Sequence, residues 1–124
     1  MNELIVVRGG GDIATGTIHR LVRCGYKVIV TEVENPSAIR RKVAFCEAVF
    51  DKEVFVDGVG CKKISSLEQA EKVFSENKAA LIVDPKCKMI DKIKPDILID
   101  GILAKKNLGT TKDMANLTIA LGPG

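Results

Sequence analysis

Three consecutive glycines near the start of the chain limit what this sequence can fold into. Gly9-Gly10-Gly11 follows the apolar run 4–7, which is typical of a short buried strand. Apolar residues then recur at helical spacing from Ile13 to Val22, and Gly25 stands where a glycine commonly ends a helix. The pattern therefore predicts a strand, a tight glycine turn and a helix, which is how a dinucleotide-binding βαβ unit begins.

The spacing within the turn indicates a nucleotide site. Gly9, Gly11 and Ala14 fit G-x-G-x-x-G/A, with Ala14 or Gly16 allowing the helix to lie close to its strand. A second strand, 26–32, ends in Glu32, an acid expected to hold ribose hydroxyls. The predicted cofactor-binding residues are Gly9, Gly10, Gly11, Asp12, Ile13, Ala14 and Glu32, and the expected cofactor is NAD(P) or a related dinucleotide. The alternative is a plain strand-to-helix turn with Asp12 as its N-cap, because the charge of Asp12 would face the phosphates.

Further strands and helices alternate along the chain, which favours an α/β fold. The sequence predicts a Rossmann-like three-layer domain, with a mostly parallel sheet, helices on both faces and an inserted β-hairpin at 53–64 around Asp57-Gly58. We expect residues 1–124 to form this single nucleotide-binding domain. The last predicted strand runs directly into Gly-Pro-Gly, so we expect the chain to be a fragment of a longer protein.

Composition excludes several functional classes. The net charge of +3, with one tyrosine, four phenylalanines and no tryptophan, does not favour nucleic acid as a partner. The four cysteines form no C-x-x-C pair and there is one histidine, so no metal site is expected, and the thiols are expected to be reduced and in or near the core. The sequence also lacks a signal-peptide pattern and a membrane-length apolar run, which points to the cytoplasm.

Basic residues stand at an unusual end of a predicted helix. The apolar stripe over 38–50 predicts a helix, and Arg40 and Arg41 lie in its first turn, where the helix dipole favours anions instead. These two arginines are therefore candidates for holding a phosphate, a carboxylate or a partner. The alternative is a solvated basic face.

A polar loop follows the predicted strand 96–103. We expect this strand to run parallel to the first one, so that the loop completes the crevice beside the glycine turn. Its candidate donors to an anionic ligand are Lys105, Asn107, Thr110 and Thr111. Either threonine is equally suited to capping a helix. No catalytic set stands out, and His19, the one histidine, is expected to be structural.

Four parts of the sequence are distinctive when taken together: R-G-G-G-D-I-A-T-G with H-R-L, P-S-A-I-R-R-K-V-A-F-C-E-A-V-F, D-P-K and I-L-A-K-K-N-L-G-T-T-K-D-M-A. In these parts the chain resembles the YqeB-type accessory proteins of the selenium-dependent molybdenum hydroxylase system. The resemblance implies a bacterial cytoplasmic protein that matures, or supplies cofactor to, such enzymes. A molybdenum hydroxylase or its maturation proteins would then be partners, and homo-oligomers are possible.

Three functional hypotheses follow. The first is an accessory protein that binds NAD(P), another nucleotide or the pyrophosphate of a molybdopterin dinucleotide. The second is an NAD(P)-dependent oxidoreductase of unknown substrate. The third is a non-catalytic Rossmann-like interaction module. The catalytic residues, if any, are not identified by the sequence.

Overall fold

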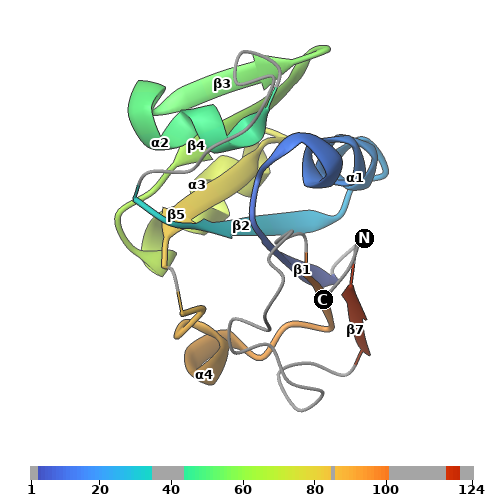
Figure 1. Ribbon diagram of the computed structural model, residues 1–124, viewed down its shortest axis with the longest axis vertical. Helices are drawn as coiled ribbons and strands as arrows, with labels where there is room; N and C mark the ends of the chain where they lie inside the picture. The colour runs from blue at the N-terminus through green and yellow to red at the C-terminus, as the bar shows by residue number, and fades with distance from the viewer. Residues whose placement is uncertain (1–2, 35–43, 85, 101–116, 121–124) are drawn as a thin grey trace.

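The computed structural model describes residues 3–34, 44–84, 86–100 and 117–120. Figure 1 shows their arrangement. In chain order the elements are β1 (Leu4–Arg8), α1 (Asp12–Arg23), β2 (Lys27–Glu32), η2 (Phe45–Glu47), α2 (Ala48–Asp51), β3 (Glu53–Val56), β4 (Val59–Lys63), η3 (Leu67–Gln69), α3 (Ala70–Ser75), β5 (Ala79–Val83), α4 (Ile90–Ile93), β6 (Ile97–Asp100) and β7 (Leu117–Ala120).

The strands form a Rossmann-like sheet with β1 near its middle. In the described part of the chain the strand order is β3-β4-β5-β2-β1-β6-β7, and every neighbouring pair is parallel except β3 and β4. β2 and β6 lie on either side of β1, so the strand order reverses at β1, where ligands bind in such sheets. The predicted α/β class, the mostly parallel sheet and the inserted hairpin are confirmed.

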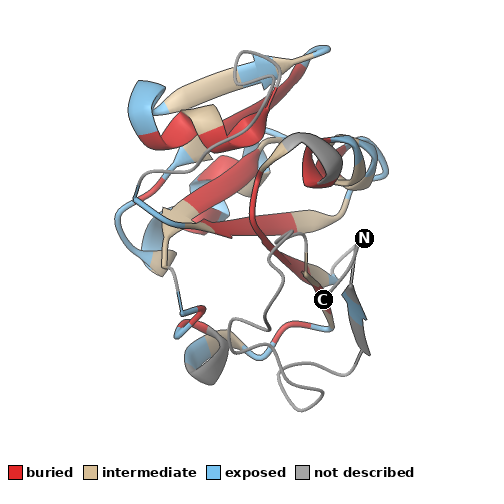
Figure 2. Ribbon diagram, in the orientation of Figure 1, coloured by how far each residue is buried: buried red, intermediate tan, exposed pale blue. Residues whose placement is uncertain are grey.

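Helices cover both faces of the sheet, as predicted. Alternate residues of β1 point to opposite faces: Val7 belongs to the cluster under α1 and α2, whereas Val6 belongs to the cluster under α3 and α4. Both clusters are fully buried at the central strands (Figure 2). The apolar run 4–7 is continuous in sequence because β1 is buried on both of its faces.

The C-terminus of α1 is closed by the predicted glycine. Gly25 has a φ of +91°, the left-handed region that side chains avoid. Its N–H donates to Val22 O at 3.0 Å, and the N–H of Tyr26 donates to Leu21 O at 3.2 Å. These two bonds form a Schellman motif, which turns the chain sharply into β2.

The inserted hairpin is fastened to the rest of the domain at both of its ends. Its turn residues Asp57 and Gly58 have φ values of +46° and +82°, as a type I′ turn requires. His19 Nε2 and Arg23 Nη2 on α1 donate to the carbonyl oxygen of Asp57 at 3.2 and 3.1 Å. This contact gives His19 the structural role expected for it.

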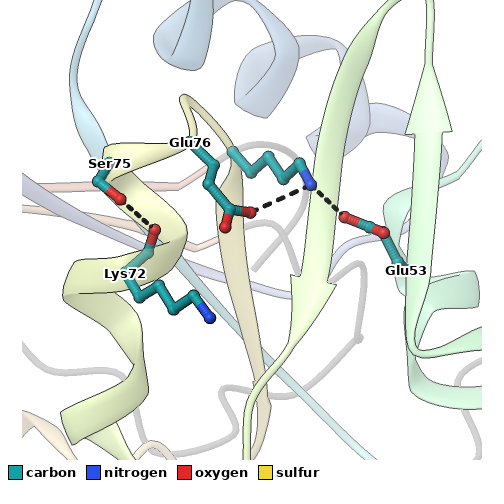
Figure 3. Close-up of polar contacts among 5 residues, drawn as sticks. Glu53, Lys72, Ser75 and Glu76 are labelled. Carbon is teal, nitrogen blue, oxygen red and sulfur yellow. Dashed lines mark hydrogen bonds and ion pairs between the residues drawn. The ribbon is translucent and has the colours of Figure 1, made fainter.

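At the start of the hairpin, an ion-pair cluster joins β3 to the end of α3. Lys78 Nζ lies 2.6 Å from Glu53 Oε2 and 3.2 Å from Glu76 Oε1 (Figure 3). Hydrogen bonds to Glu53 and Glu76 raise the pKa of Lys78, and the bond from Lys78 lowers the pKa of Glu76. The charged forms of Lys78 and Glu76 are therefore favoured in the folded protein.

The cysteines divide into two environments. Cys46, Cys61 and Cys87 are buried and Cys24 is exposed, all four as free thiols. The expectation of reduced thiols in or near the core is confirmed for the three buried ones and is wrong for Cys24, because that residue caps α1 at the surface. No helix within the described residues has the length and apolar character that crossing a membrane would require.

Gly16 within α1 and Gly25 just after its C-cap should change stability in opposite directions when each is replaced by alanine. Gly25→Ala should lower the free energy of unfolding by about 1–2 kcal/mol, because alanine would have to adopt a left-handed backbone. Gly16→Ala should raise it by about 0.5–1 kcal/mol, because Gly16 lies exposed inside the helix and no atom in the described part of the chain is within 4 Å of an added Cβ. Urea unfolding of both variants measures the difference, and effects of equal sign would contradict this account of α1.

Candidate functional site

The glycine turn lies at the carboxyl edge of the sheet, beside the point where strand order reverses. Arg8, the last residue of β1, is in register with Thr31 of β2 and Asp100 of β6. Gly9 follows with a φ of +91°, and its N–H donates to Thr31 O at 2.7 Å. Gly9 is therefore needed by the fold, because a side chain there would strain the backbone.

Gly10 is a glycine because another part of the backbone lies against it. An added Cβ would be 2.9 Å from the backbone nitrogen of Cys46 and 3.3 Å from Val30 Cγ1. The N–H of Gly10 donates to Glu32 Oε2 at 2.7 Å, and its carbonyl oxygen accepts from the N–H of Cys46 at 2.8 Å. The backbone groups of Gly10 are thus bonded within the protein, and its requirement for glycine is structural.

Gly11 differs from Gly9 and Gly10 because nothing in the described structure requires it to be glycine. Its φ of −76° and ψ of −165° are open to any residue, and no atom of the described residues lies within 4 Å of an added Cβ. It is the N-cap of α1, with no side-chain cap hydrogen bond. The prediction that Asp12 is the N-cap is therefore wrong by one residue, because Asp12 is already the first helical residue. The side chains of Asp12 and Ile13 lie outside the described part.

Close packing of α1 on the sheet depends on Ala14. Ala14 is buried in the cluster under α1, whereas Gly16 is exposed with open space around it. Of the two residues that the motif offered for this close approach, Ala14 fills the role and Gly16 does not.

Glu32 lies beside the turn, as its position at the end of β2 predicted. Its two carboxylate oxygens accept hydrogen bonds from separate backbone groups, Oε2 from Gly10 and Oε1 from the N–H of Val33 at 2.9 Å. The side chain is half-buried. A carboxylate can accept about four hydrogen bonds, so this geometry leaves capacity for hydroxyl donors of a ligand.

Sequence reasoning missed Thr15. Its hydroxyl oxygen is 2.7 Å from Gly11 O and 3.1 Å from Gly10 O, and it accepts from the N–H of Phe45 at 3.0 Å. The side chain is 5% exposed. The available signal was a β-branched hydroxyl residue next to a buried helix position, a place where threonine commonly bonds to the backbone.

The prediction of one helix over 38–50 is wrong, because the backbone is not helical at Ala44. That residue is extended, with a φ of −115° and a ψ of 137°, and only η2 and the single turn α2 follow it. The cause lies in the two N–H groups after it: those of Phe45 and Cys46 donate to Thr15 and Gly10 instead of to a preceding helical turn. Arg40 and Arg41 lie outside the described residues. Glu32, which precedes them in the chain, and Cys46, which follows them, are both hydrogen bonded to Gly10.

A buried polar row lies on the face opposite α1. Arg8 on β1 is level with Thr31 on β2 and with Asp100 on β6. Arg8 and Thr31 are fully or nearly fully buried, and Asp100 is half-buried. Thr31 Oγ1 donates to Cys87 Sγ at 3.9 Å, and burial is the main cause that raises the pKa of the Cys87 thiol. The strand 96–103 is parallel to β1 as predicted over its described part, whereas Lys105, Asn107, Thr110 and Thr111 lie outside the described residues.

Among the described residues, no group of three histidine, cysteine, aspartate or glutamate side chains is placed to hold a metal ion.

Comparison with known proteins finds one strong sequence relation. Over 123 residues, 99% of this chain, it is 50% identical to "Uncharacterized protein YqeB" of Escherichia coli (strain K12). The chain is a homologue of that protein and spans 23% of its length. No protein-family model and no solved structure matches the chain.

Substitutions should destabilise the protein at Gly10, where the backbone of Cys46 lies close, and should be tolerated at Gly11, where there is open space. Gly10→Ala should lower the free energy of unfolding by about 1–3 kcal/mol, because its Cβ would press on the backbone of Cys46. Gly11→Ser should leave stability unchanged or raise it by a few tenths of a kcal/mol (about 0.3), because serine is a better N-cap than glycine. Thermal unfolding compares the two. A large loss for Gly11→Ser would mean that the fold requires glycine there.

Proposed function

We propose that this domain binds a nucleotide, NAD(P) or a related dinucleotide, across the glycine turn. The observation that carries the proposal is Gly11. It is a glycine at an N-cap where serine or aspartate would stabilise the helix more, and neither backbone strain nor crowding by the described residues explains it. Room for the phosphates of a ligand beside the N–H groups of the first helical turn gives a reason for it.

Glu32 supports the ribose half of this proposal. Its carboxylate is fixed beside the turn by the N–H groups of Gly10 and Val33, so it is oriented before any ligand arrives. A preoriented carboxylate loses less entropy when it accepts hydrogen bonds from a ribose diol. Arg40, Arg41, Lys105, Asn107, Thr110 and Thr111 are proposed to supply donors to the rest of the ligand.

We place this binding activity in an accessory protein that acts in the cytoplasm on a selenium-dependent molybdenum hydroxylase. The support for this role is the resemblance of four sequence blocks, which are distributed along the chain between Arg8 and Ala115. Nucleotide binding and the accessory role are separable, since a domain can bind the nucleotide without serving that system. Each therefore needs its own assay.

The Glu32 contact also favours a second candidate function, a Rossmann-like interaction module without a ligand. The carboxylate already satisfies the N–H of Gly10, so the turn is stable without an added anion. In this case the domain would contribute a protein-binding surface and the open space at Gly11 would have no occupant. Nucleotide titration of the folded protein distinguishes the two candidates.

Adding a side chain at Gly11 should abolish nucleotide binding. Gly11→Val should eliminate the calorimetric signal for NAD⁺ while the domain stays folded, because valine would fill the space that a phosphate needs. Gly16→Val is the matched control, since it adds the same side chain at another open glycine of the region and should bind as the parent does. Hydroxylase activity in cells that carry either variant in place of the parent tests the accessory role.

The negative charge of Glu32 predicts which of the two cofactors, NAD⁺ or NADP⁺, binds more tightly. NAD⁺ should bind more tightly than NADP⁺, because the 2′-phosphate of NADP⁺ would meet the like charge of Glu32. Glu32→Gln should reduce this preference, since it removes the charge and keeps an oxygen acceptor. Parallel titrations with both cofactors decide the point. A clear preference of the parent for NADP⁺ would remove Glu32 from the ribose role and favour Arg40 or Arg41 as partners of the phosphate.

A further inference from the structure

Thr15 lies where three separate parts of the chain meet. Its hydroxyl contacts the carbonyl oxygens of Gly10 and Gly11 in the turn, and it accepts the N–H of Phe45 from the segment that precedes α2. The neighbouring N–H of Cys46 donates to Gly10 O. The segment Ala44–Cys46 is therefore held against the turn by two adjacent backbone donors, one of which depends on the Thr15 side chain.

These bonds act on the peptide groups that border the open space at Gly11. The Gly10 carbonyl belongs to the Gly10–Gly11 peptide, whose nitrogen is the N–H of Gly11. The Gly11 carbonyl belongs to the next peptide, whose nitrogen is the N–H of Asp12. Because a peptide is planar, fixing the two carbonyl oxygens also fixes the direction of these two N–H groups.

The Thr15 contacts with Gly10 and Phe45 are also buried. Thr15 is 5% exposed, and Phe45 and Cys46 are buried. The hydrogen bonds are thus protected from competition, and loss of the hydroxyl would leave the N–H of Phe45 without this acceptor in a buried place.

We propose that Thr15 is a positioning residue of the glycine turn: its hydroxyl holds Ala44–Cys46 against Gly10 and so sets the direction of the N–H groups of Gly11 and Asp12. This inference rests on the proposed nucleotide site for its functional meaning. Thr15 does not touch the ligand in this account. It affects affinity by fixing the turn before the ligand binds, which lowers the ordering cost of binding.

The test compares three variants in the full chain. Thr15→Val keeps the shape of the side chain and removes the hydroxyl, and Thr15→Ser keeps the hydroxyl. Ile18→Val, on the same helix, removes one methylene from a fully buried position in the core cluster under α1 and α2. Calorimetry gives the Kd for NAD⁺, and amide hydrogen exchange by NMR reports on Gly10, Phe45 and Cys46.

Thr15→Val should raise the Kd by about tenfold, equivalent to ~1.4 kcal/mol, while Thr15→Ser and Ile18→Val should stay within about twofold of the parent. Exchange should accelerate at Gly10 and Cys46 as well as at Phe45 in Thr15→Val only. Rescue by serine, together with unchanged binding in Ile18→Val, separates positioning from a general loss of stability. Thr15→Ala, which presses no methyl group against the Gly10 carbonyl, takes the place of Thr15→Val if that variant does not fold.

Two results would overturn the proposal: a Kd for Thr15→Val equal to that of Ile18→Val, or faster exchange confined to Phe45. If the parent protein does not bind NAD⁺, the proposed cofactor is wrong, and exchange alone then decides the role of Thr15. Faster exchange at Gly10 in Thr15→Val that is restored in Thr15→Ser supports positioning, and unchanged exchange at Gly10 refutes it.

Discussion

The hydrogen bonds on the backbone of Gly10 are the constraint on which this end of the domain depends. The Glu32 carboxylate holds its N–H, and the N–H of Cys46 holds its carbonyl oxygen, so β2, the turn and the segment before α2 meet at one residue. A side chain at Gly10 would separate the turn from Cys46. Because Gly10 and Cys46 are buried and Glu32 is half-buried, each of these two bonds removes a desolvation cost that an unpaired group would carry.

This arrangement divides the glycine-rich sequence into residues with different duties. Gly9 provides the left-handed backbone that the turn needs, and Gly10 provides the close approach to Cys46. Gly11 has neither duty among the described residues, and the proposed nucleotide would give a reason for its identity. A motif match treats the three glycines as equivalent parts of one signature. Their surroundings show that two of them serve the fold.

Much of the fold could be predicted from the sequence because its signals are local. Three elements are specified by residues close together in sequence: β1 by the apolar run Leu4–Val7, the hairpin by the Asp57-Gly58 turn, and the end of α1 by Gly25. The helix expected over 38–50 was wrong at Ala44 because two N–H groups just beyond it bond to Gly10 and Thr15, which are distant in sequence. Thr15 was missed for the same reason: its hydroxyl bond to Phe45 depends on tertiary structure, and helical periodicity does not reveal it. Glu32 was found because the end of a second strand is a position that sequence spacing can identify.

The contacts that hold Gly10 also bear on how the domain folds. Gly10 and Glu32 are 22 positions apart, and Thr15 and Phe45 are 30 positions apart, so the turn takes its final shape only when remote parts of the chain have come together. Contacts of long sequence separation form after the entropy of closing the intervening loop has been lost. The hairpin at Asp57-Gly58, by contrast, is specified by adjacent residues. We therefore expect the hairpin to form early and the glycine turn late, so that a ligand at the turn would bind and stabilise only chains whose central strands have already assembled.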